Sequence, residues 1–225
     1  MSQAVRELLP FAIGVAIVPI PVIAVILMLF SESASVNAPA FLVGWSAGLT
    51  AAFVGAYLLA EAGGVGTSSR AADGGGWLRI ALGGLLLLLA GRVWRKRPAP
   101  GAGAELPRWM AAVDSLAPGK ALGLGFALAA LNPKNLALTI SAAVGLVELD
   151  LSTGDDVAGL VAFVLIGSLS VGLPVVYSLA GGVGARSALD ELKGWLALHD
   201  RAIVAVLLLV FGVVLISRGL APLTG

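Results

Sequence analysis

The sequence has no cysteine, a single histidine and few charged residues for its length. Of its 225 residues, 12% are charged and 59% are hydrophobic, whereas soluble domains have about 25% charged and 45–50% apolar residues. The absence of cysteine excludes disulfides, thiolate metal sites and thiol redox chemistry. Too little polar surface remains to cover a soluble enzyme of this size, and disordered chains are far more polar. The composition therefore indicates an integral membrane protein.

The sequence also lacks the motifs of several other classes of protein. A net charge of +1 leaves no large basic surface for nucleic acid. No Walker motif, His-Glu-x-x-His or Gly-x-Ser-x-Gly occurs, so we expect neither ATP hydrolysis nor an enzyme of the metalloprotease or hydrolase type. We predict that the protein is not an enzyme and needs no cofactor or metal.

Six apolar runs are long enough, or nearly so, to cross a bilayer, which takes about 20 residues of helix. They cover residues 8–30, 39–60, 80–91 (extended by Trp77 and Leu78), 121–147, 157–185 and 202–217. We interpret all six as transmembrane helices of an all-α integral membrane protein.

The distribution of Lys and Arg predicts the orientation of these helices. The loops after the first, third and fifth runs hold nine basic residues, and the opposite side holds four. Because basic loops stay in the cytoplasm, we predict a multi-pass protein of the plasma membrane with both termini extracytoplasmic. The first of the cytoplasmic loops, residues 31–38, carries Glu32 and no basic residue.

A polar stretch rich in proline and glycine divides the runs into two sets of three. It predicts a first three-helix repeat at residues 1–95, a basic cytoplasmic linker at 96–120 and a second repeat at 121–225. Since each set has an odd number of spans, the second repeat is inverted relative to the first, and prolines interrupt helices 1 and 4. Apolar residues at helical spacing in 187–201 predict an amphipathic helix on the membrane surface.

The fourth run contains the only charge deep inside an apolar segment. Lys134 lies near the middle of 121–147, where a cation costs about 2.5–3.5 kcal/mol and needs a partner or water. Pro133 breaks the helix beside it. Asn132 and Asn135 either satisfy the broken backbone or bind a ligand. We predict that these four residues bind substrate.

Two prolines interrupt the first run at a comparable depth. Pro19 and Pro21 join the predicted site, because breaks in both repeats would direct half-helix ends at one cavity. Helix N-termini favour anions. No Asp or Glu lies within an apolar run, so the only mid-membrane charge is positive. These features favour an anionic substrate over a metal cation.

Several motifs in the sequence form one pattern. They are Trp109-x4-Asp114, Pro118-Gly119-Lys120-Ala121-Leu122-Gly123-Leu124-Gly125, Leu131-Asn132-Pro133-Lys134-Asn135-Leu136-Ala137-Leu138, and Pro19-x-Pro21 with Phe41-Leu42-Val43-Gly44-Trp45. This pattern resembles the GAP family, the peptidoglycolipid- or sulfolipid-addressing proteins of actinobacteria. Its Asn-Pro-Lys part recurs in the lysine exporter (LysE) superfamily of six-span exporters. The resemblance implies an exporter-like protein linked to delivery of complex lipids to the cell surface.

We therefore predict a LysE-type exporter that moves a lipid or glycolipid with an anionic or polar headgroup towards the cell surface. Asp114 and Lys120 are predicted to form a cytoplasmic gate or to contact the headgroup. Two alternatives stay open: an exporter of small, amino-acid-like solutes, and a non-transporting scaffold for a lipid export or synthesis machinery. The expected partners are membrane lipids, a second copy of the chain in a homodimer, or such a lipid export or synthesis complex.

Overall fold

The computed structural model describes residues 2–63, 69–95, 116–180 and 182–220, and these ranges fold as helices joined by short turns. The helices are α1 (Gln3–Ala16), α2 (Pro19–Phe30), α3 (Ala34–Ala62), α4 (Ser69–Arg95), α5 (Pro118–Ala130), α6 (Pro133–Val147), α7 (Thr153–Ala180) and α8 (Gly182–Leu220). The prediction of an all-α protein is confirmed for these residues.

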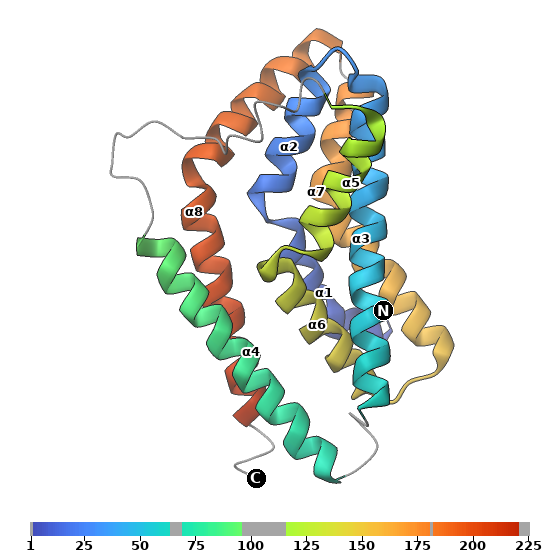
Figure 1. The fold of residues 1–225 in the computed structure, drawn as a ribbon, viewed down its shortest axis with the longest axis vertical. Coiled ribbons are helices and arrows are strands. Elements are labelled where there is room, and N and C mark those ends of the chain that lie inside the picture. Colours follow the sequence, from blue (N-terminus) through green and yellow to red (C-terminus); the bar gives the residue numbers. More distant parts are fainter. Residues whose placement is uncertain (1, 64–68, 96–115, 181, 221–225) are drawn as a thin grey trace.

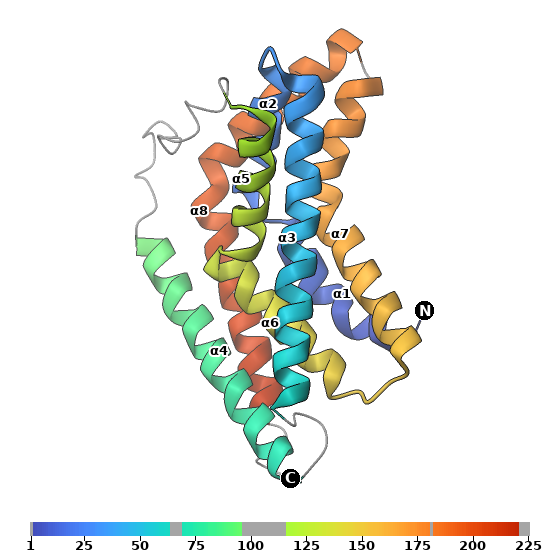
Figure 2. The same ribbon diagram turned by 45° about the vertical axis from the view of Figure 1, so that its right-hand side comes forward.

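The chain passes back and forth along one long axis (Figure 1). In Figures 1 and 2, α1 and α2 together run upwards, α3 runs down, α4 up, α5 and α6 together down, α7 up and α8 down. α1 begins and α8 ends in the lower half of both views. The two pairs α1–α2 and α5–α6 therefore each act as one interrupted helix.

Several of these helices have the length and composition of membrane spans. Within the described ranges, three qualify singly: Ala34–Ala62, Thr153–Ser178 and Gly184–Leu220. The pair Gln3–Ala16 and Pro19–Phe30 qualifies as a fourth, bent by 56° at its break. The protein is thus a helical membrane protein, with apolar helices that fit several crossings.

Prolines determine where the interrupted helices restart. Pro19 and Pro133 each lie at the first position of a helix, where the missing N–H would have no partner in any case and the fixed φ favours helix. The sequence predicted the first and fourth runs to be broken by proline, and both are interrupted at these residues. Each break lies at mid-height of the bundle (Figure 1).

Glycines bring α3 and α5 into backbone contact. A Cβ on Gly44 would lie 2.0 Å from the Leu122 carbonyl oxygen, and one on Gly125 would lie 2.2 Å from the Phe41 carbonyl oxygen. α4 meets α8 in the same way, because a Cβ on Gly83 would lie 2.7 Å from the Gly212 carbonyl oxygen. Small residues allow this approach, which drives helix association in lipid.

Polar and aromatic contacts join α3 to α7 in antiparallel register. The Trp45 indole N–H donates to the Gly167 carbonyl oxygen at 3.2 Å, and the Ser46 and Ser168 hydroxyls lie 3.1 Å apart. Further along, the rings of Phe53 and Phe163 pack with centroids 5.1 Å apart. These contacts hold α3 and α7, two uninterrupted spans, side by side.

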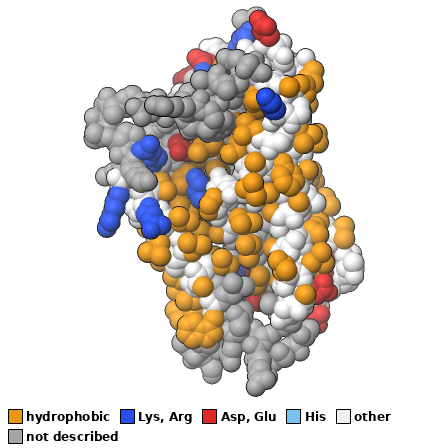
Figure 3. All heavy atoms as spheres, viewed as in Figure 1, with side chains coloured by type: hydrophobic (Ala, Val, Ile, Leu, Met, Phe, Trp, Pro, Cys, Tyr) orange, Lys and Arg blue, Asp and Glu red, His pale blue; other side chains and the backbone are white. Residues whose placement is uncertain are grey.

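The outer surface is largely apolar. Figure 3 shows hydrophobic side chains over most of the visible face, with Lys and Arg gathered on the left, where α4 ends in Figure 1. Exposed Leu and Val side chains recur along α3, α4, α7 and α8. Apolar patches of this extent on a protein surface indicate contact with lipid or another chain.

The predicted surface helix at 187–201 is the first part of α8. α8 runs without interruption over 39 residues, about 58 Å at 1.5 Å per residue and well beyond the thickness of a bilayer. In Figure 1 this first part slopes across the upper end of the bundle. Its location in the membrane interface stays a prediction, as does the division into two domains and a linker.

The glycine contact between α3 and α5 can be tested with two substitutions in the same helix. We expect Gly44→Ala to lower the free energy of unfolding by about 1–3 kcal/mol, because a methyl group at this site overpacks the interface. Gly55→Ala is the matched control, since a Cβ there meets nothing within 4 Å. Thermal melting in detergent measures both. Equal melting temperatures for the two variants would contradict the close packing.

The orientation in the membrane can be tested with single cysteines at Thr153 and Ser187. Both positions are exposed and lie near opposite ends of α7. Since the Ser187 side carries more basic residues, we expect Ser187→Cys to be shielded from an impermeant thiol reagent in intact cells and Thr153→Cys to be labelled. The unchanged chain has no cysteine and gives no background. The opposite labelling pattern would reverse the predicted topology.

Candidate functional site

The break between α5 and α6 is capped by the side chain of Asn132. Its Oδ1 accepts the backbone N–H of Lys134 at 3.1 Å, and its carbonyl accepts the first intrahelical bond, from the Leu136 N–H at 2.8 Å. Pro133 contributes no donor. Asn132 is therefore an N-cap, which holds α6 at its starting point.

Asn135 closes the other side of the same break. This fully buried side chain donates through Nδ2 to the carbonyl of Leu128 at 3.1 Å, one of the carbonyls left open at the end of α5. Of the two roles that the sequence left open, the structure shows both asparagines satisfying the interrupted backbone. The Asn135 Oδ1 and the hydroxyl of Thr139, one turn later, are buried without a hydrogen-bond partner.

The break between α1 and α2 exposes few backbone donors. Val18 is the N-cap of α2, so the next three residues would present free N–H groups. Two of these three are Pro19 and Pro21, which have no N–H, and Ile20 alone keeps one. The prolines thus lower the cost of interrupting a helix in apolar surroundings. They also leave little for an anion to bind at this helix end.

The two breaks meet at a small cavity that contains Lys134. Gly14 and Val18 line it from the first break, and Lys134 and Leu138 line it from α6; α8 closes it with Val204, Leu207, Leu208 and Phe211. The cavity has a volume of about 10 Å³, room for about one water. Residues of both breaks thus line one cavity, which is too small to hold a substrate.

Asp200 of α8 is the acidic partner of Lys134, and the sequence interpretation missed it. The two charges lie close enough to interact, although no ion-pair contact joins them in the described part of the chain. The Asp200 Oδ1 is buried and has no hydrogen-bond partner. Lys134 is therefore not the only charge inside the bundle, and the anionic substrate stays a prediction.

A periodic signal in the sequence could have identified Asp200. The core-facing side chains of α8 recur at intervals of one or two helical turns, with spacings of seven, eight, four, three and four residues; they are Leu189, Leu196, Val204, Leu208, Phe211 and Leu215. Asp200 lies four residues after Leu196 and four before Val204, on the same face of the helix. Grouping it with the polar face of a separate surface helix concealed this position.

Of the predicted site residues, Lys134 is the one that lines the cavity within the described part of the chain; Pro19, Pro21, Asn132, Pro133 and Asn135 belong to the two breaks but do not line it. Lys120 is exposed in the first turn of α5 and is not among the residues around Lys134. Asp114 lies outside the described residues. Among the described residues, no group of three or more His, Asp or Glu side chains is placed to hold a metal ion.

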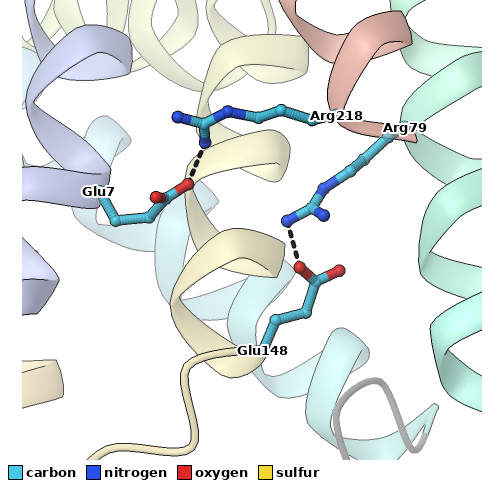
Figure 4. A network of polar contacts seen from close by, with 4 residues as sticks. All are labelled: Glu7, Arg79, Glu148 and Arg218. Atoms are coloured by element: carbon cyan, nitrogen blue, oxygen red, sulfur yellow. Dashed lines mark hydrogen bonds and ion pairs between the residues drawn. The ribbon is translucent and has the colours of Figure 1, made fainter. Parts of the chain in front are cut away.

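Two ion pairs tie helices together at the end where α1 begins and α8 ends (Figure 4). Arg218 of α8 pairs with Glu7 of α1, and Arg79 of α4 pairs with Glu148 at the end of α6. Burial raises the pKa of Glu148, and the Arg79 guanidinium opposes that rise. These pairs join α4 to the end of α6 and α8 to α1, at the end of the bundle below the Lys134 cavity.

The fold and this site define a helical membrane protein in which two interrupted helices meet at a buried pair of opposite charges. The family model described as "Sap, sulfolipid-1-addressing protein" matches residues 8–221, nearly the whole chain. The chain therefore belongs to the sulfolipid-addressing family, and the resemblance inferred from its motifs is confirmed. No curated protein and no solved structure matches it.

The interaction between Lys134 and Asp200 predicts a non-additive pair of substitutions. Lys134→Met leaves the partly buried Asp200 carboxylate with Arg201 as its nearby cation, and Asp200→Asn leaves the partly buried Lys134 ammonium without its carboxylate, so each single variant should be destabilised. The double variant should recover part of the loss, with a coupling of about 0.5–3 kcal/mol. Melting temperatures in detergent measure this cycle. Lys120→Met, the same change at an exposed site, should have little effect, and strict additivity would exclude a functional pair.

Proposed function

We propose that the chain is an exporter of the LysE type that moves a lipid with an anionic or polar headgroup towards the cell surface. The observation that carries the proposal is the meeting of two interrupted helices at the cavity that Lys134 lines, with the Asp200 carboxylate within electrostatic range of Lys134. Interrupted helices that meet near the bilayer midplane are typical of transporter sites. The description of the family, sulfolipid-1-addressing protein, supports a lipid cargo.

The packing of the helices supports an inverted repeat. α3 packs against α5 and α6 of the second half, and α7 correspondingly packs against α1 and α2 of the first half. α3 also packs against α7, and α4 against α8. This is the set of contacts expected when α1–α4 correspond to α5–α8 about a two-fold axis. On this basis we assign six crossings, two of them interrupted.

The opposite charges of Lys134 and Asp200 provide the chemistry of the proposed transport cycle. In the closed form Asp200 balances the charge of Lys134, and the cavity excludes cargo. An anionic headgroup that reaches Lys134 would take the place of the Asp200 carboxylate, which then gains a proton or moves to water. Opening towards the outside would also require the ion pairs of Glu7–Arg218 and Arg79–Glu148 to separate.

The shape of the protein favours a lipid over a small solute. The cavity beside Lys134 is closed, whereas an apolar groove of about 400 Å³ lies between α4 and α8. Leu87, Ala90 and Trp94 of α4 line it, together with Ala205, Val206 and Leu209 of α8. Acyl chains fit such a groove, and an amino-acid-like solute does not. The scaffold alternative makes a different prediction, since a scaffold moves no lipid by itself.

Lipid movement by the purified chain tests the proposal. In vesicles that contain NBD-labelled phosphatidylglycerol, we expect the protein alone to speed transfer of the label between leaflets, measured by dithionite quenching. Lys134→Met should abolish the transfer, because no cation remains to bind the headgroup. Lys134→Arg should keep part of it if the residue only binds the anion, and none if the residue must lose its proton.

The control for this assay is Arg6→Gln, which also removes one positive charge. Arg6 is exposed on α1, outside the Lys134 cavity, so transfer should be unchanged. Normal transfer by Lys134→Met would remove the site from the mechanism. Absence of transfer by the unchanged protein, with a folded sample, would favour the scaffold.

A further inference from the structure

A second cavity lies at the upper end of the bundle, apart from the one at Lys134. It has a volume of about 290 Å³ and is bounded by Leu29, Phe30 and Ser31 at the end of α2, Ala34 at the start of α3, Ser178 of α7 and Arg186 of α8. Its polar side chains are the hydroxyls of Ser31 and Ser178 and the guanidinium of Arg186. It has room for a small oxyanion and waters.

Arg186 supplies a positive charge with most of its donors available. Its guanidinium lies over the Phe30 ring, 5.6 Å from the centroid, and Nη2 donates to the Phe30 carbonyl at 3.5 Å. In the described residues this is the hydrogen bond that the guanidinium makes, out of five N–H donors. Lys193 also lies over Phe30, at 5.2 Å, but Asp190 already holds its ammonium at 2.6 Å.

The start of α3 adds a second attraction for an anion. α3 has 29 residues, and its first residue, Ala34, lines the cavity, so the positive end of the helix dipole acts there. The N-cap Ser33 makes no side-chain cap hydrogen bond, and the first turn has no acidic residue. Glu32 is exposed in the loop before the N-cap and is not among the lining residues.

This arrangement corrects what the sequence says about the loop after α2. That loop contains Glu32 and no basic residue, which argues against contact with anionic lipid. The fold brings Arg186 to it from 156 positions further along the chain. The basic group that the loop lacks is therefore supplied by α8.

We propose that this cavity binds the sulfate or phosphate group of a membrane lipid headgroup. The outer face of α7 indicates a lipid source, because exposed apolar side chains follow it at helical spacing: Val157, Val161, Leu165, Leu169, Leu173 and Val176. Val176, the last of these, lies on a different face of α7 from Ser178 but within one turn of it, so the stripe ends at the level of the cavity. A lipid can thus place its oxyanion beside Arg186 and its acyl chains along α7. The inference gives the proposed exporter a headgroup site at the end predicted to be cytoplasmic, and binding there does not require transport.

Short-chain lipids that differ only in the anion test this assignment. We expect dioctanoyl phosphatidic acid to raise the melting temperature of the purified protein in a saturable way, and dioctanoylglycerol and inorganic phosphate to have no such effect. Arg186→Gln should weaken the phosphatidic acid affinity about tenfold, the value of one charge-assisted hydrogen bond. Arg6→Gln should leave the affinity unchanged. Ser178→Ala, which removes one hydroxyl, should weaken it less than Arg186→Gln.

The outcomes separate this site from the transport mechanism. Lys134→Met should bind phosphatidic acid normally even where it moves no lipid, so failed transport leaves this inference standing. Equal affinity in Arg186→Gln and the unchanged protein would overturn it. Equal affinity for inorganic phosphate would also overturn it, because the ligand would then be a free anion. Should Arg186→Gln not fold, an unchanged affinity in Ser178→Ala together with Arg186→Lys would overturn it as well.

Discussion

The structure depends on how an interrupted helix satisfies its backbone where no water is available. A free N–H or carbonyl in hydrocarbon costs several kcal/mol, so membrane helices are normally continuous. Here α1–α2 and α5–α6 both stop and restart. Pro19, Pro21 and Pro133 remove donors, while Asn132 and Asn135 satisfy part of what remains. Residue types that bind ligands in other sites here lower the free-energy cost of two helix breaks.

These breaks in turn create the environment of Lys134. Because α6 starts at mid-height, its first turn directs a long cationic side chain towards the other break and towards α8. A cation at that depth needs a counter-charge, and Asp200 provides one at longer range than a contact pair. A pair held apart in this way is stabilising but incomplete. In the cycle that we propose, an anion that binds Lys134 would therefore displace no contact salt bridge.

Much of the fold could be predicted from the sequence, because apolar length and proline position act locally. The runs at 39–60 and 157–185 became α3 and α7 with only shifted ends, and proline predicted the breaks at Pro19 and Pro133. Long-range partners could not be predicted in the same way. Asp200 and Arg186 lie on α8 and act on α6 and α2, so their roles depend on how helices pack and not on neighbouring residues. Treating residues 187–201 as a separate surface helix concealed the position of Asp200.

Cationic side chains occur at both ends of the bundle and at its centre. Arg186 lies at the upper end, Lys134 at mid-height, and Arg79 and Arg218 at the lower end, each beside an acidic or carbonyl oxygen. Between them the cavities and the groove are lined mainly by apolar side chains. Such spacing supports the lipid cargo that we propose, because each cation could receive its negative group while exposed apolar helices contact its chains. A hydrophilic solute would instead require a continuous polar path, and neither the cavity at Lys134 nor the groove between α4 and α8 provides one.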